Sequence, residues 1–313
     1  MENHGSELEA AYRVPASVAP RISRWAGFAA MIISAVAFGG LAVFARLAYA
    51  SGATPVTVLF LRFSMAALMM AGLMRARRLK MPRGRTLLGL IALGAVGYVG
   101  QSLAFFTALT MASAGLVALL LYLYPMLVTL FSVVLFKERL TPIKAGALAA
   151  AVVGSALTIG PVGGGQPLGI GLSVLAAVIY ATYILVGSRI TPAAGPIPAS
   201  TVIISSAAVV YGGLMAAQGP VFPQTTGGWL AIGGVALIST VVAIVFFFIG
   251  LERIGPTASS TISALEPLVT VLLAVTVLHE RVVPLQIAGG ALILASVVGL
   301  ALSDEHKEEK DKG

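Results

Sequence analysis

Apolar residues follow one another along the chain in long runs, and short polar breaks separate these runs. A helix needs about 20 apolar residues to cross the hydrocarbon core of a bilayer. Ten runs have about this length, at residues 25–48, 56–74, 86–109, 112–136, 142–160, 168–188, 199–217, 229–250, 256–278 and 284–302. The pattern predicts an all-α integral membrane protein with ten transmembrane helices, flanked by polar tails at residues 1–24 and 303–313.

The boundary between the third and fourth runs is the least distinct one. Only Thr110, Met111 and Ala112 lie between them, and these residues contain no charge. One merged or re-entrant segment is therefore the alternative to two separate helices there.

Composition agrees with a membrane protein and excludes several other classes. The 313 residues are 58% hydrophobic and 10% charged, and the mean hydropathy is +0.98. A soluble domain has about 25% charged residues, so this chain lacks the polar residues to cover a soluble surface. Because it contains no cysteine, disulfides and thiolate metal sites are excluded.

The distribution of positive charge predicts the orientation in the membrane. If the N-terminus is cytoplasmic, 17 of the 20 Lys and Arg residues fall on the inner side, only Arg281 falls outside, and Arg46 and Arg62 lie within spans. This bias places both termini in the cytoplasm. Membrane orientation then explains the net charge of +8, and no nucleic-acid partner is expected.

The two halves of the chain repeat each other at an offset of 142 residues. The 38 residues from Phe105 and those from Phe247 share ten identities, which include the pairs Pro125/Pro267 and Glu138/Glu280. Residues 25–160 and 161–302 are therefore predicted to be two five-helix repeats. An odd number of spans in each half gives the halves opposite orientations, an arrangement typical of alternating-access transporters.

These motifs also resemble a known family. The segments LYLYP and KERLTP in and after the fourth span, and ALEP and HER in the ninth, resemble the EamA-type transporters of the drug/metabolite transporter superfamily. Arg62, in the sequence FLRF of the second span, is typical of that family as well. The resemblance covers residues 25–302 and implies ten helices around a central cavity and export of small metabolites, amino acids or drugs.

Glu266 is the strongest candidate for a functional residue. It lies near the middle of the ninth span and precedes Pro267, and Tyr124–Pro125 occupies the equivalent position in the fourth span. Proline interrupts the helical hydrogen bonds, and transporters build their sites at such broken helices. A carboxyl group at this depth suits a proton that is bound and released in each cycle. The alternative is a protonated glutamate that only packs against a neighbouring helix.

Other polar and aromatic residues in the spans extend this candidate site. Arg62 is predicted to pair with Glu266 or with a substrate carboxylate, the alternative being that its side chain snorkels to the headgroups, as is expected for Arg46. Aromatic and amide side chains at helical spacing are candidates to line the cavity, namely Tyr98 and Gln101 in the third span and Tyr180 and Tyr183 in the sixth. The predicted binding residues for substrate or ion are Glu266, Arg62, Tyr124, Tyr98, Gln101, Tyr180 and Tyr183, with helix breaks at Pro125 and Pro267.

No catalytic, metal or cofactor site is expected. His279–Glu280 lacks the second histidine of a zinc protease motif, and the glycine-rich segment at residues 163–171 fits no nucleotide-binding loop. Glu280–Arg281 and Glu138–Arg139 end their spans, where a role in helix-end structure is expected.

The sequence thus predicts a secondary transporter of the bacterial inner membrane. It is expected to export small metabolites by alternating access and to be proton-coupled or gradient-driven, with a small-molecule substrate, membrane lipids and protons as its partners. Small residues recur in the fifth and tenth spans, which suits close helix packing within a monomer or in a homodimer. A membrane enzyme or a non-transporting receptor is the alternative, and a channel is a third.

Overall fold

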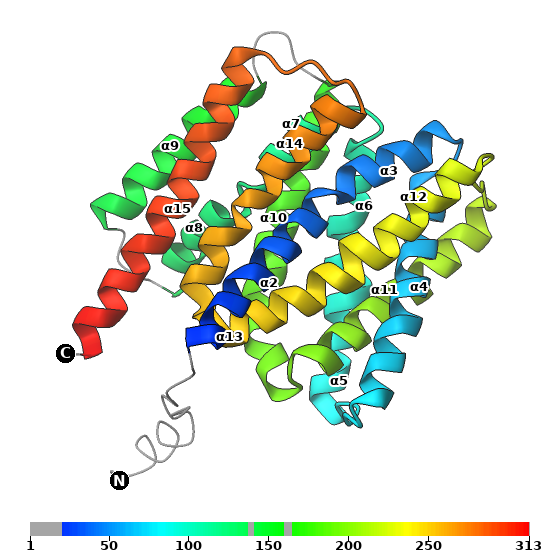
Figure 1. Ribbon diagram of the computed structural model, residues 1–313, viewed down its shortest axis with the longest axis horizontal. Helices are drawn as coiled ribbons and strands as arrows, with labels where there is room; N and C mark the ends of the chain where they lie inside the picture. Colours follow the sequence, from blue (N-terminus) through cyan, green and yellow to red (C-terminus); the bar gives the residue numbers. More distant parts are fainter. Residues whose placement is uncertain (1–20, 137–140, 160–164, 313) are drawn as a thin grey trace.

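The computed structural model describes residues 21–136, 141–159 and 165–312, which fold into a bundle of helices (Figure 1). Outside the helices, the described residues contain one isolated bridge, between Ala112 and Gly165. The first half contains α2 (Arg21–Gly39), α3 (Leu41–Ala50), α4 (Pro55–Ala76), α5 (Gly84–Ala92), the π-helical turn η1 (Leu93–Tyr98), α6 (Val99–Ala108), α7 (Ala114–Leu121), α8 (Tyr124–Phe136) and α9 (Pro142–Ile159). The second half contains α10 (Pro167–Ile190), the short η2 (Thr191–Ala193), α11 (Pro196–Gln218), α12 (Thr226–Ala236), the π-helical turn η3 (Leu237–Val242), α13 (Ala243–Ser263), α14 (Leu265–Val277) and α15 (Pro284–Lys312).

The predicted fold class is confirmed. Seven helical stretches in the described residues are long and apolar enough to cross a membrane, and three shorter apolar helices occupy residues 145–158, 265–277 and 284–299. Together they follow the order of the ten predicted runs. Large apolar side chains such as Leu68, Val209 and Leu230 are more than 70% exposed on the outside of the bundle, as expected for a surface that faces lipid rather than water.

The third and fourth spans are separate helices, so the merged alternative is wrong. α6 ends at Ala108 and α7 begins at Ala114. Ser113 caps α7, because its hydroxyl accepts a hydrogen bond from the Leu116 N–H. The cap shows that a new helix begins here, after the turn at residues 109–113.

The first span differs from its prediction because it is interrupted near its middle. α2 ends at Gly39 and α3 begins at Leu41. Two adjacent glycines weaken the helix there, and Gly39 lies so close to α14 that an added Cβ would be 2.9 Å from the Glu266 carbonyl oxygen. The glycine therefore allows the two backbones to approach each other.

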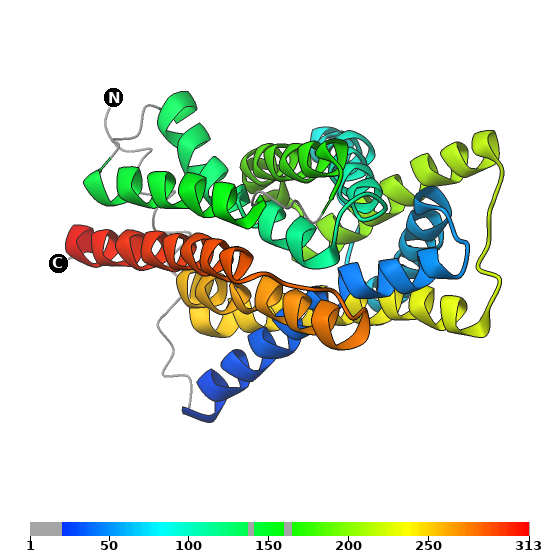
Figure 2. The same ribbon diagram turned by 90° about the horizontal axis from the view of Figure 1, so that it is seen from above.

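Helices of the first half pack against helices of the second half. α2 packs on α13, α4 on α11, α3 on α12 and α9 on α15. Figures 1 and 2 both show α9 and α15 side by side at one end of the molecule. α5 begins at Gly84 and α12 at Thr226, which reproduces the 142-residue offset. The start of α2 and the end of α15 lie on the same side of the bundle (Figure 1), as an even number of crossings requires.

Candidate functional site

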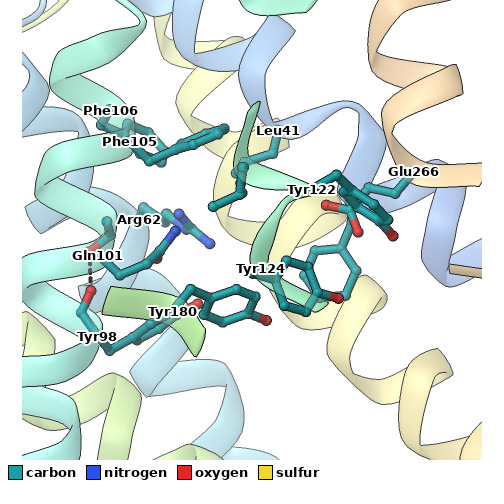
Figure 3. A pocket seen from close by; sticks show the side chains of 13 residues that line it. Leu41, Arg62, Tyr98, Gln101, Phe105, Phe106, Tyr122, Tyr124, Tyr180 and Glu266 are labelled. Carbon is teal, nitrogen blue, oxygen red and sulfur yellow. Dashed lines mark hydrogen bonds between the residues drawn. The ribbon is translucent and has the colours of Figure 1, made fainter. Parts of the chain in front are cut away.

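A cavity of about 90 Å³, here called the central cavity, lies between the helices of the two halves (Figure 3). Its polar lining consists of Arg62, Tyr98, Gln101, Ser102, Tyr122, Tyr124, Tyr180 and Glu266, and its apolar lining consists of Phe38, Leu41, Phe105, Phe106 and Leu121. Six of the seven residues predicted to bind substrate or ion therefore face one space. They come from α4, η1, α6, α8, α10 and α14.

Two further cavities adjoin the central one. The larger has about 270 Å³ and shares Phe38, Tyr98 and Tyr180 with it. Tyr183, the seventh predicted residue, lines this second space, which we call the aromatic cavity. The smaller has about 20 Å³ and shares Glu266 and Tyr122 with the central cavity. The three spaces are therefore neighbours, and together we call them the hollow region.

Two interrupted helices meet at this hollow region. α7 ends at Leu121 and α8 begins at Tyr124, whereas α13 ends at Ser263 and α14 begins at Leu265. Each helix start is followed closely by its proline, Pro125 or Pro267. The two interruptions are joined directly, because the Tyr122 hydroxyl donates a hydrogen bond to the Ser263 carbonyl oxygen. The break between α7 and α8 thus places Tyr122 where its hydroxyl reaches the second half of the chain.

Glu266 is the second residue of α14, and its carboxylate faces the central cavity beside Tyr122 and Tyr124 (Figure 3). Its side chain is half-buried and makes no hydrogen bond or ion pair with any other described residue. The backbone around it is fixed, since Thr270 Oγ1 lies 2.9 Å from the Gly39 oxygen and 3.1 Å from the Glu266 oxygen. A positioned carboxylate with unused hydrogen-bonding capacity can accept a proton or the ammonium group of a ligand.

Arg62 lies across the central cavity from Glu266 and is held by other groups (Figure 3). Its Nε donates a 2.9 Å hydrogen bond to Thr240 Oγ1, and its guanidinium carbon lies 4.8 Å from the ring centre of Phe63 and 5.3 Å from that of Phe106. Only 3% of the residue is exposed. The alternative that Arg62 snorkels to the headgroups is therefore wrong, and the described residues contain no ion pair between Arg62 and Glu266.

Aromatic rings connect the two charged groups. Tyr124 and Tyr180 have ring centres 4.7 Å apart, Tyr180 and Tyr183 are stacked at 5.9 Å, and Tyr98 stacks on Tyr183 at 5.6 Å. Within the described part of the chain, the hydroxyls of these four tyrosines have no hydrogen-bond partner. The rings therefore offer flat apolar surfaces together with unused hydroxyls, which is the composition of a small-molecule site.

Gln101 completes the polar lining, and a nearby hydrogen-bond network holds its helix in place. Gln101 is 7% exposed and lies on α6, one residue before Ser102. The Ser102 hydroxyl is 2.8 Å from the Tyr211 hydroxyl, which also donates to the Val99 oxygen at 2.9 Å. This network fixes the start of α6, which follows the π-helical turn η1.

Several residues of the site were missed from the sequence. Tyr122 was not selected, although it stands two residues before the Tyr124–Pro125 pair that marked the break. Thr240, the partner of Arg62, lies in the π-helical turn η3, and no feature of the sequence points to that turn. Phe38 lines all three cavities because it directly precedes the unpredicted break in the first span.

Two charged residues outside the cavities bind helix ends. Arg46 donates a 2.8 Å hydrogen bond from its Nη1 to the Leu109 oxygen at the end of α6. The Glu280 carboxylate accepts hydrogen bonds from Ala114 N at 2.8 Å and from Gly115 N at 3.3 Å. Glu138 and Arg139, the equivalents of Glu280 and Arg281 in the first half, lie outside the described residues.

Comparisons with known proteins agree with this architecture. Residues 25–160 and 167–302 each match the EamA-like transporter family. An "Uncharacterized transporter" of Archaeoglobus fulgidus is 28% identical over 276 residues, which cover 87% of this chain and 95% of the relative. The "Uncharacterized transporter YdeK" of Bacillus subtilis is 28% identical over 278 residues, which cover 85% of this chain and 91% of the relative.

A solved crystal structure shares the fold as well. It superposes with a TM-score of 0.64 at 22% identity, over 89% of this chain and 97% of the other. The resemblance read from the LYLYP, KERLTP and ALEP segments is confirmed by the family match, whose two successive segments together cover most of the chain. The chain is a multi-pass membrane protein that belongs to the EamA-like transporter family.

Proposed function

We propose that this transporter is a secondary transporter of the bacterial inner membrane that exports small metabolites such as amino acids or drugs. It works by alternating access, with the central cavity as the substrate site and both termini in the cytoplasm. A proton gradient drives the export. The observation that carries the proposal is that Glu266 and Arg62 face the same cavity from opposite sides without pairing with each other.

This separation of charge suits a zwitterionic substrate. The ammonium group binds the free Glu266 carboxylate, and a carboxylate group binds the guanidinium of Arg62, whose planar fork matches carboxylate geometry. The tyrosine rings between them contact the apolar part of the substrate. A cationic drug without a carboxylate still binds Glu266 and the ring faces, through charge and cation–π attraction.

Proton coupling follows from competition at Glu266. The carboxylate makes no hydrogen bond with other described residues, so it binds either a proton or the positive group of the substrate, but not both. Substrate binding from the cytoplasm releases the proton, and proton binding from the outside releases the substrate. Net export then uses the inward proton gradient.

Purified protein in proteoliposomes tests this proposal. A panel of amino acids and cationic drugs is supplied with and without a pH gradient, and both flux and chemical conversion are followed. We expect saturable movement of unchanged compound that the gradient accelerates. Conversion of the compound would instead support a membrane enzyme, and binding without flux would support a receptor. A flux rate far above about 10³ s⁻¹ would indicate a channel, because it exceeds the usual turnover range.

A further inference from the structure

The turn between α6 and α7, residues 109–113, and the start of α7 are bound by three distant parts of the chain. Arg46 of α3 donates to the Leu109 oxygen at 2.8 Å. The Gln166 N–H, just before α10, donates to the Met111 oxygen at 2.8 Å. Glu280, just after α14, accepts from Ala114 N at 2.8 Å. The turn therefore joins the first, sixth and ninth spans at one end of the bundle.

Arg46 and Glu280 each carry a charge opposite in sign to the dipole of the helix end that they bind. Arg46 binds a carbonyl oxygen at the C-terminal end of α6, where the helix dipole is negative, and Glu280 binds N–H groups at the positive N-terminal end of α7. Both are charge-assisted hydrogen bonds, which are about twice as strong as neutral ones. Neither residue lines any of the three cavities described above, so the proposed binding of substrate does not use them.

The helix that follows the turn lines the hollow region. Ala118 of α7 lines the smallest cavity, together with Leu41, Leu121 and Glu266. It lies one helical turn, about 6 Å at 1.5 Å per residue, from the Ala114 N–H that Glu280 holds. The turn is on the side of the bundle away from both ends of the described chain (Figure 1). α7 packs against α14 and α3, so movement of α7 away from either helix widens the space beside Glu266.

We propose that Glu280 and Arg46 form a latch that closes the cavity on this side and releases when the cavity opens there. This inference rests on the proposed alternating access. Opening separates α7 from the Glu280 segment after α14, or separates the α6–α7 turn from α3. The hydrogen bonds of the latch contribute to the free energy of that step. Glu280 is thus a positioning residue for transport and does not contact the substrate.

Cysteine labelling tests the latch without knowledge of the substrate. The chain contains no cysteine, so Ala118→Cys introduces a single thiol behind the latch with little change in volume. A membrane-impermeant, charged methanethiosulfonate is added to right-side-out membranes, on the face opposite the termini. We expect Glu280→Ala to raise the labelling rate about tenfold. If the latch loses about 1.4 kcal/mol of stabilisation, the sparsely populated open state becomes about ten times more populated.

Matched variants make the result specific. Arg281→Ala removes a neighbouring exposed charge and is expected to leave the labelling rate unchanged. Glu280→Gln keeps the size and one acceptor and is expected to give a smaller increase than Glu280→Ala, so it also serves if the alanine variant does not fold. A monodisperse chromatographic peak in detergent checks folding. An unchanged rate in folded Glu280→Gln and Glu280→Ala would overturn the latch. The proposed function is tested separately, by the flux measured in proteoliposomes.

Discussion

Arg62 and Glu266 face one cavity, yet they are held in different ways. A buried guanidinium is costly unless other groups compensate it, and Arg62 has the Thr240 hydroxyl and two ring faces for this purpose. Glu266 has no such partner among the described residues, although its helix start is fixed by Thr270. We therefore expect substitutions of Arg62 to affect both folding and binding, and substitutions of Glu266 to affect transport alone.

Substitution of Arg62 tests its proposed contact with a substrate carboxylate. Arg62→Gln removes the positive charge and the bidentate fork, so we expect KM for zwitterionic substrates to rise at least about tenfold, the value of one charged hydrogen bond. Cationic substrates without a carboxylate should show little change or bind more tightly. Arg85→Gln, at an exposed position, is the control. An equal loss for both substrate classes would mean that Arg62 is structural.

Glu266→Gln tests proton coupling. Glutamine has the same size and still forms hydrogen bonds, so the fold should be retained, but it cannot take up or release a proton. Exchange of substrate should survive, whereas gradient-driven accumulation should collapse. The measurement is the accumulation ratio at fixed internal pH, with the external pH stepped between about 5.5 and 8, a range around neutrality in which a coupling carboxyl must titrate. A variant whose ratio follows the gradient as the wild type does would place the coupling elsewhere.

At the scale of the elements, the two helix breaks form one structural unit. α7–α8 and α13–α14 are each interrupted just before a proline, and the Tyr122 hydroxyl bonds to the Ser263 oxygen across them. Glu266, Tyr122 and Tyr124 lie at these breaks, so the breaks determine how these three side chains face the cavity. The backbone conformation at the two breaks therefore helps to determine the shape of the cavity.

Pro125→Ala and Pro267→Ala are expected to impair transport without loss of folding. In a helix interior, alanine is more favourable than proline by about 3 kcal/mol. Each substitution is therefore expected to straighten its break and to keep or raise thermal stability. Transport should fall in both variants to a similar degree, since both breaks line one cavity. Melting temperature and initial flux are the two measurements. Normal flux in both variants would limit the prolines to a role in insertion or folding.

The elements also show what could be predicted from the sequence and what could not. Long apolar runs place the ten spans, and proline marks both breaks near the cavity. The break at Gly39–Gly40 was missed because both glycines lie within a continuous apolar run, and their effect depends on the approach of α14. The hydrogen bond of Arg46 was not predicted, because depth along a helix does not reveal the carbonyl oxygen that a neighbouring turn presents.

At the scale of the molecule, the inverted arrangement requires a definite topology. Reporter fusions at Ser303 and in the loop at residues 75–85 should both read cytoplasmic, because that side collects the positive charges. A fusion at residues 218–228 should read external, since an odd number of spans separates it from the loop at 75–85. A cytoplasmic result at residues 218–228 would contradict the opposite orientation of the two halves.

The most direct test of the whole account asks whether the central cavity opens to each side of the membrane in turn. Leu121→Cys places one thiol where the central cavity meets the smallest cavity, in a chain that has no other cysteine. An impermeant thiol reagent is applied from one face and then from the other, in vesicles of both orientations, while proton and ion leak is recorded. Alternating access predicts labelling from both faces in vesicles whose membranes do not conduct protons or ions. Labelling from neither face or from one face alone, or labelling from both accompanied by ion conductance, would contradict it.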